Sequence, residues 1–137
     1  MDKWVFYGKS GNPSSDIAKA WLKNNGIPFE SHSIFQLTRG EIARLADLIP
    51  GGVRTLIYPD VFSYSIVNPQ RKMERQYIEK IHSGELSEEE IRDLLAGLPS
   101  LAITPIITNY EKIMVGYDID TMNSNFRFVK VKDITTA

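Results

Sequence analysis

The chain has 137 residues, of which 42% are hydrophobic and 24% charged, and its formal net charge is −1. This length and composition are typical of a globular domain with a sizeable core, and the near-neutral charge gives no general attraction to nucleic acid. The sequence contains no cysteine, which excludes disulfides, thiolate catalysis and cysteine-ligated metal sites.

The N-terminal segment predicts a strand, a helix and a second strand. The aromatic and β-branched run 3–7 is typical of a strand, and Gly8 and Gly11 then indicate a loop. The helix is expected to begin at Asn12, a strong N-cap that proline follows. Its apolar face is expected to hold Ile17, Ala20, Trp21 and Asn24. The second strand is expected within 27–35.

The middle of the chain predicts helices. Segment 38–49 has the spacing of an amphipathic helix, which Pro50 and the glycines after it end. Segment 53–68 is expected to form short helical turns and loop. A helix is predicted within 69–84, and another begins at the cap Ser87, with Glu90 completing a capping box. The residues expected to face the core are Ile42, Leu45, Leu48, Ile49, Met73, Tyr77, Ile78, Ile81, Ile91, Leu94 and Leu95.

The C-terminal segment predicts two strands, 103–108 and 112–117, joined by a hairpin-sized connection. The tail 122–137 is expected to be extended. Strands on both sides of a helical block indicate a mixed sheet with helices packed on it. The sequence has no repeat or linker that would separate two domains.

Five segments, in this order, resemble the arsenate-reductase-like (ArsC-like) group of thioredoxin folds, and most closely its transcription-regulator branch, the Spx proteins. They are FYGKSGNPSSDIAKAWL, GIPFESHSIF, EIARLADLIPGG, TPIIT and VGYDID, which extend over most of the chain up to Asp120. The resemblance implies an α/β fold: a thioredoxin-like mixed four-stranded sheet, built from 1–37 and 101–137, with an inserted helical subdomain, 38–100.

The resemblance also implies particular residues and a partner. The family's two redox cysteines fall on Asn12 and Ser15, and its cis-proline on Pro105. The glycine that faces the C-terminal domain of the RNA polymerase α subunit in Spx proteins falls on Gly52. The residues expected to contact this partner are Tyr7, Lys9, Ser10, Gly11, Asn12, Ser15, Gly51, Gly52 and Arg54. The alternative is structural: a core tyrosine, a solvated lysine and glycines in turns.

The chain departs from the Spx pattern at several positions. Asp60 and Phe62 stand where that branch carries basic residues associated with promoter function, and Ile103 and Thr104 replace an arginine pair. The C-terminal region, helical in the family, has the pattern of a strand. These differences predict that DNA contact is only indirect or weak, and favour inhibition of transcription over activation. A bacteriophage-encoded or paralogous antagonist would fit this pattern.

No catalytic residue, cofactor or metal site is expected. An amide is not a nucleophile, and Ser15 would need an adjacent base that the sequence does not identify. We expect Asn12 to cap the helix instead, with a contribution of about 1 kcal/mol. His32 and His82 are the only histidines and lack ligand spacing. The carboxylates 88–90 suit a helix start, and the basic residues of 71–80 are interpreted as a solvated face.

The sequence therefore predicts a non-enzymatic, Spx-like regulator that binds the polymerase α subunit without redox switching. No signal peptide or run of roughly 20 apolar residues is present, so we expect a cytoplasmic protein without membrane contact. Two alternatives stay open: a cysteine-less arsenate-reductase-like pseudoenzyme, and an adaptor that binds another protein through the same face.

Overall fold

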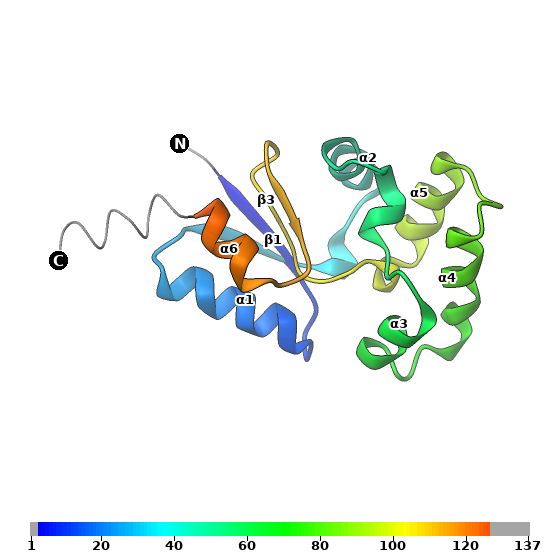
Figure 1. Cartoon of the computed structure of the whole chain (residues 1–137), viewed down its shortest axis with the longest axis horizontal. Coiled ribbons are helices and arrows are strands. Elements are labelled where there is room, and N and C mark those ends of the chain that lie inside the picture. The colour runs from blue at the N-terminus through cyan, green and yellow to red at the C-terminus, as the bar shows by residue number, and fades with distance from the viewer. Residues whose placement is uncertain (1–2, 127–137) are drawn as a thin grey trace.

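A mixed four-stranded sheet lies between two groups of helices (Figure 1). The computed structural model describes residues 3–126. The strands are arranged in the order β2-β1-β3-β4; β1 and β2 are parallel, and the other two pairs are antiparallel. Their bounds are Trp4–Gly8 for β1, Phe29–Ser33 for β2, Ile106–Thr108 for β3 and Ile113–Val115 for β4. The predicted α/β class, the mixed four-stranded sheet and the C-terminal hairpin are confirmed.

Alternation along β1 divides the core in two, because successive side chains of a strand point to opposite faces. Trp4 and Phe6 pack on one face with α1 (Pro13–Asn24) and α6 (Ile119–Asn125). Val5 and Tyr7 pack on the other face with α2 (Arg39–Leu48) and α5 (Glu88–Gly97). Both clusters also contain residues of β3, so the sheet is covered on both sides, as Figure 1 shows.

The helix α1 begins as predicted, but the residues that it packs against the sheet are not the predicted ones. Asn12 is its N-cap, and its buried residues are Ser15, Ala18 and Leu22. Ile17, expected inward, is 51% exposed, so the predicted apolar face is wrong. Ser15 and Ala18 are small, which lets the first turns of the helix approach the sheet closely.

Short elements precede α2, separate it from α5 and follow α5. They are η1 (Ile34–Gln36), η2 (Gly52–Leu56), α3 (Val61–Val67), η3 (Lys72–Glu74), α4 (Arg75–His82) and η4 (Pro99–Leu101). The short turns expected in 53–68 are therefore present. In 69–84 the α-helix is shorter than predicted, and Met73, expected inward, is 80% exposed. Met73 lies in the 3-10 turn before α4, so it does not follow the helical phase that buries Ile78 and Ile81.

The C-terminal segment differs from its prediction. Residues 122–125 belong to α6, where an extended tail was expected. Asp118 caps this helix by accepting the N–H of Asp120 at 3.0 Å, and Met122 and Phe126 are buried against the sheet. The rest of the predicted tail, 127–137, lies outside the described residues. Within residues 3–126 no helix has the length and hydropathy to span a membrane.

Candidate functional site

A neutral hydrogen-bonded cluster lies at the N-terminal end of α1, which we call its mouth. The Oδ1 atom of Asn12 accepts the backbone N–H of Ser15 at 2.9 Å, the Ser15 hydroxyl at 2.7 Å and the Thr104 hydroxyl at 3.2 Å. All three residues are at least 95% buried. The predicted cap is confirmed, and Thr104, one of the residues that replace the arginine pair, fastens it to the segment before β3.

Pro105 lies next to this cluster. The Thr104–Pro105 peptide bond is cis, as the resemblance implied, and Pro105 is buried. Its carbonyl accepts the N–H of Gly116 at 2.7 Å. Position 105 therefore joins the start of β3 to the end of β4, directly beside the cap of α1.

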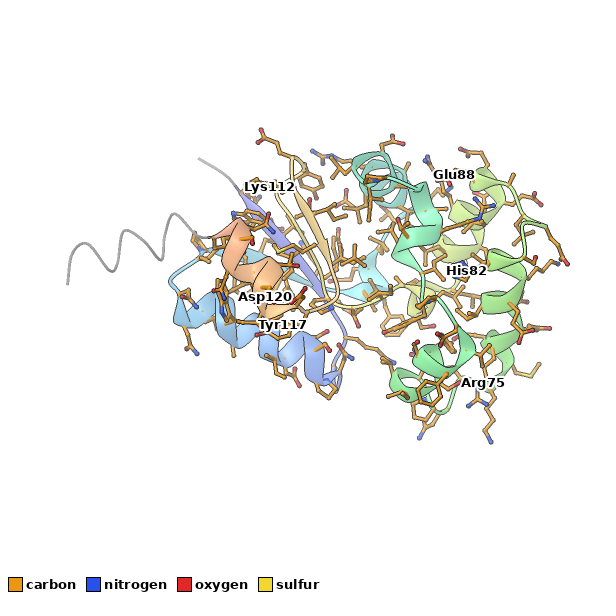
Figure 2. The ribbon with its side chains drawn as sticks, in the orientation of Figure 1. Arg75, His82, Glu88, Lys112, Tyr117 and Asp120 are labelled. Carbon is orange, nitrogen blue, oxygen red and sulfur yellow. The ribbon has the colours of Figure 1, made fainter. Side chains whose placement is uncertain are left out.

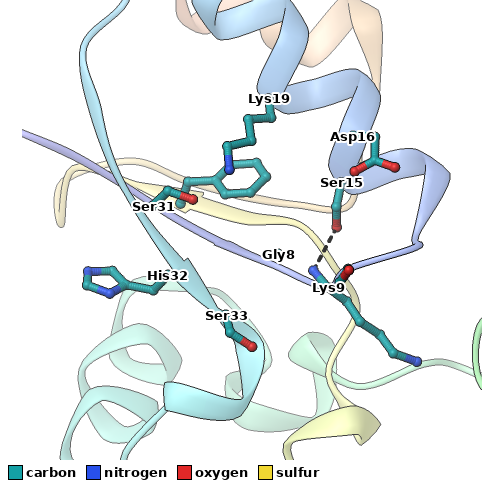
Figure 3. A pocket seen from close by; sticks show the side chains of 10 residues that line it. Gly8, Lys9, Ser15, Asp16, Lys19, Ser31, His32 and Ser33 are labelled. Carbon is teal, nitrogen blue, oxygen red and sulfur yellow. Dashed lines mark hydrogen bonds between the residues drawn. The ribbon is translucent and has the colours of Figure 1, made fainter.

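Among residues 3–126, Ser15 has no activating base within hydrogen-bond reach. Its Oγ donates to Asn12 and accepts the Lys9 backbone N–H at 3.1 Å, so the hydroxyl is occupied in both directions. His32 borders the same pocket of about 310 Å³ (Figure 3), but its Nε2 pairs with Glu30 at 3.0 Å. A nucleophilic serine needs a base within hydrogen-bond reach. The contacts of the cluster are those of a helix cap anchored to the segment before β3.

The sequence did not indicate that His32 borders the Ser15 pocket. The parallel pairing of β1 with β2 places His32 opposite Tyr7, and their rings stack with centroids 5.4 Å apart. The signal that could have found it is the shared direction of the two strands, which brings their carboxyl ends to one edge.

The loop residues expected to meet a partner differ in exposure. The side chains of Tyr7, Asn12 and Ser15 are buried, whereas Ser10 and Gly11 are exposed. Contacts from the three buried side chains to a partner stay a prediction, one that their burial weighs against. A partner on this face would meet Ser10 and Gly11 first.

Lys9 is a tether between this loop and α3. Its Nζ donates to the Val67 carbonyl at 3.2 Å and to the Oδ1 of Asn68. Burial and the nearby Arg71 guanidinium lower the pKa of Lys9. The predicted contact residue thus already has partners within the chain, at the C-terminal end of α3.

The second predicted surface, the turn between α2 and η2, is also closely packed. Gly51 and Gly52 have φ of 91° and 70°, and a Cβ on Gly52 would lie 2.5 Å from Oε1 of Glu88. The Glu88 carboxylate accepts the Val53 N–H at 3.0 Å and the Arg92 Nε–H at 2.9 Å. Gly52 is therefore required by left-handed backbone and by close approach to α5.

Arg54, the last predicted contact residue, reaches across the helical segment. Its guanidinium donates to the backbone carbonyls of Leu86 and Ile81, so it links η2 to the end of α4 and to the segment that follows it. Figure 1 shows the α2–η2 turn on the α2 side of the molecule, away from the mouth of α1. The nine predicted contact residues therefore belong to two stretches that the fold does not merge into one cluster.

A further polar group, missed by the sequence interpretation, connects the sheet to α2 and the β3–β4 hairpin. The hydroxyls of Tyr7 and Tyr110 both donate to Oε2 of Glu41, at 2.9 and 2.5 Å. The Arg44 guanidinium lies 3.5 Å from the centre of the Tyr110 ring. Burial and the bond to Glu41 raise the pKa of Tyr110 to about 12. These residues border a pocket of about 650 Å³.

Potential metal ligands do not converge in the described part of the chain: residues 3–126 contain no group of three or more His, Cys, Asp or Glu side chains that could hold an ion.

Comparison with curated proteins identifies regulators. The chain is 27% identical over 118 residues to the global transcriptional regulator Spx of Lactiplantibacillus plantarum, covering 85% of this chain and 80% of the relative. It is 27% identical over 109 residues to Spx of Streptococcus pneumoniae, covering 78% and 73%. No family model matches the sequence.

Solved structures show the fold independently. A protein related to the ArsC family from Bacteroides fragilis superposes with a TM-score of 0.70 at 19% identity, over 90% of this chain and 97% of its own. Arsenate reductase from Vibrio cholerae superposes with a TM-score of 0.66 at 17% identity, over 84% and 90%. With Spx relatives over most of its length and ArsC-type structural neighbours, the chain fits a divergent member of the Spx/ArsC-like group.

Proposed function

We propose that this protein is a transcriptional regulator that binds the C-terminal domain of the RNA polymerase α subunit and acts without a redox switch. The observation that carries the proposal is its likeness to Spx regulators over 85% of the chain, combined with a neutral amide–hydroxyl cluster at Asn12 and Ser15. The likeness supports a regulatory role, and the cluster supports a role without thiol chemistry.

The absence of cysteine sets how such a regulator is controlled. A disulfide switch needs two thiols, and the chain has none. Oxidants therefore leave its affinity for the α subunit unchanged, and its activity follows its abundance. The same reasoning assigns it no arsenate reductase activity; reduction of arsenate by the pure protein, with an added thiol reductant, would contradict this part of the proposal.

The α3 region supports inhibition rather than activation. Asp60 accepts the backbone N–H of Ser63 at 2.7 Å and caps α3, while Phe62 is 75% exposed. An acidic cap and an exposed aromatic ring give no positive charge for a DNA phosphate. The protein would occupy the α subunit without supporting promoter contact, so transcription from an activator-dependent promoter in vitro should fall when it is added. Stimulation would reject this direction.

Binding is tested by titrating the isotope-labelled α C-terminal domain with the full chain and following chemical shifts. We expect saturable shift changes at micromolar concentration, equal with and without an oxidant. No change at high micromolar concentration would overturn the proposal.

A matched pair of glycine variants tests which face is used. Gly11 and Gly84 both have positive φ, and at each of them an added Cβ would have no heavy atom within 4 Å; asparagine tolerates this conformation. Gly11→Asn adds bulk to the exposed loop and should weaken binding about tenfold, whereas Gly84→Asn, in the turn after α4, should not. Equal affinities for both variants would remove the α1 loop from the interface.

A further inference from the structure

A pocket of about 350 Å³ lies between α3 and α4, two helices that pack against each other. We call it the α3–α4 pocket. The segment that opens α3 and the second half of α4 supply most of its lining, namely Pro59, Asp60, Val61, Ile78, Glu79 and His82. Its volume is at the lower end of the range for ligand sites, which gives room for one long side chain and little more.

The floor of the α3–α4 pocket is apolar. Ile78 is buried in the hydrophobic core, and Val61 packs against the same cluster, while Pro59 adds an exposed apolar ring to the lining. A hydrocarbon stem that lay over these side chains would remove apolar surface from water, as the stems of long basic residues do. The pocket therefore favours an occupant with an apolar stem.

The polar groups of the pocket are acceptors. Asp60 accepts the Ser63 backbone N–H and the Ser63 hydroxyl, both at 2.7 Å. These bonds, together with the nearby His82 ring, lower the pKa of Asp60, so this carboxyl is ionised at neutral pH. Glu79, exposed on α4, is the second carboxylate. The Nε2–H of His82 donates to the Tyr58 carbonyl at 2.9 Å, which leaves Nδ1 of the neutral ring as an acceptor.

The two carboxylates of the pocket have no cationic partner in the described part of the chain. Within residues 3–126 neither Asp60 nor Glu79 forms an ion pair with a lysine or arginine, and no lysine or arginine lines the pocket. The basic residues of α4 lie elsewhere. Lys80 lines a separate pocket next to α5, and Arg75 lies at the opposite end of α4 from His82, as Figure 2 shows. A cation from outside the chain would therefore complement the charge of the pocket.

We propose that the α3–α4 pocket binds an arginine side chain of a partner protein. The stem of that arginine would lie over Val61 and Ile78. Its guanidinium would pair with the carboxylates of Asp60 and Glu79, and one N–H would donate to Nδ1 of His82. Arginine fits better than lysine, because a guanidinium holds several donors in one plane and is less strongly hydrated than an ammonium. A phosphate or an acidic segment would meet both carboxylates with no lysine or arginine of the pocket to offset them. The proposal does not depend on binding to the α subunit.

The probe is a displayed library of short peptides selected against the full chain. The counter-selection uses Asp60→Asn/Glu79→Gln, the pocket variant. It removes both charges, while asparagine at position 60 keeps a side-chain cap for α3. We expect the peptides that are enriched on the wild-type protein to contain arginine. Enrichment of acidic peptides, or enrichment of the same peptides on the pocket variant, would overturn the proposal.

The affinity of one selected peptide then tests the contact. It should fall about tenfold or more in the pocket variant, and by a similar factor when alanine replaces the arginine of the peptide. The matched control is Glu85→Gln/Glu111→Gln, which removes two exposed carboxylates outside the pocket and changes the net charge equally. This control should bind the peptide as the wild-type protein does. Equal losses in the two double variants would mean that the peptide responds to net charge and not to the pocket.

Chemical shifts and sedimentation test the place and the occupant. The peptide should shift amide resonances within 58–63 and 78–83, and shifts confined to other segments would contradict the proposed site. A dimer that the pocket variant dissolves would mean that an arginine of a second copy fills the pocket. Full affinity after lysine replaces the arginine of the peptide would mean that any cation suffices. Either result contradicts an arginine supplied by a partner protein.

Discussion

Two buried polar clusters hold this molecule together, and they differ in charge. At the mouth of α1, Asn12, Ser15 and Thr104 are joined by hydrogen bonds between neutral groups. In the helical segment, the carboxylate of Glu74, 8% exposed, accepts the hydroxyls of Tyr64 and Ser100. Both clusters connect elements that are distant in the sequence.

The difference teaches where the fold can tolerate change. A neutral cluster has little desolvation penalty, so losing one member removes hydrogen bonds and little else. A buried carboxylate depends on every donor around it, and its donors depend on it in turn. The neutral cluster, which should tolerate the loss of a member, stands where the Spx/ArsC-like family carries its redox cysteines. The charged cluster around Glu74, which should not, connects α3 to η3 and η4.

The largest expected effect is therefore at Glu74. Glu74→Ala leaves two buried hydroxyls, of Tyr64 and Ser100, without an acceptor, and should lower the free energy of unfolding by about 3 kcal/mol. Urea denaturation measures the loss. Glu89→Ala, which removes an exposed ion pair with Arg39, should lose about 0.5 kcal/mol. Equal losses in the two variants would mean that the Glu74 cluster has no special weight.

At the neutral cluster the effect should be smaller. Asn12→Ala removes the cap of α1 and the acceptor of the Thr104 hydroxyl, and should lower the free energy of unfolding by about 1–2 kcal/mol. Asn12→Ser keeps a capping oxygen and should recover part of this loss. If Asn12→Ala lowered the free energy of unfolding more than Glu74→Ala does, the neutral cluster would be the less tolerant of the two, contrary to this prediction.

Local rules were enough to predict the neutral cap. Asn12 before a proline, and Ser87 with Glu90 three residues later, are patterns whose partners lie within one turn, and the structure contains both caps. The hairpin between β3 and β4 was predictable for the same reason. The resemblance supplied the thioredoxin-like four-stranded sheet, which such rules cannot give.

The charged contacts could not be predicted because their partners are remote. Glu74 meets Ser100 across 26 positions, and Gly52 meets the carboxylate of Glu88 across η2 and α5. Met73 was placed wrongly because a 3-10 turn shifts the helical phase just before α4. In each case the deciding contact is tertiary, so the hydrophobic periodicity within one helix or strand cannot predict it.

A still smaller effect is expected where the loop of the neutral cluster meets the helical segment. Lys9→Met removes the donor to the Val67 carbonyl and to Asn68 but keeps the length of the side chain, so unfolding should become easier by about 1 kcal/mol. Hydrogen exchange of the amides in 8–12 should rise. Lys112→Met, on an exposed turn, is the control, and an equal effect there would show that Lys9 tethers nothing.

The last prediction concerns Glu41 and the two tyrosine hydroxyls that donate to it. Its effect on stability is small near neutral pH and grows at alkaline pH, where the tyrosines titrate. Burial and the bond to Glu41 raise the pKa values of Tyr7 and Tyr110 above the ordinary value of about 10, that of Tyr110 to about 12. A phenol with a raised pKa keeps its proton in the folded state after the unfolded chain has lost it. Its stabilising contribution is complete below about pH 10 and is lost as the pH rises toward about 12.

Denaturation midpoints measured at several pH values between neutral and strongly alkaline should therefore fall above about pH 10 in the wild-type protein. They should fall less steeply in Tyr110→Phe, which removes one titrating hydroxyl from Glu41. The loss caused by Asn12→Ala should be the same at both ends of this range, because no group of its cluster titrates. The stability loss caused by Asn12→Ala could instead change with pH as much as the loss caused by Tyr110→Phe. That result would contradict the distinction between neutral and charged clusters.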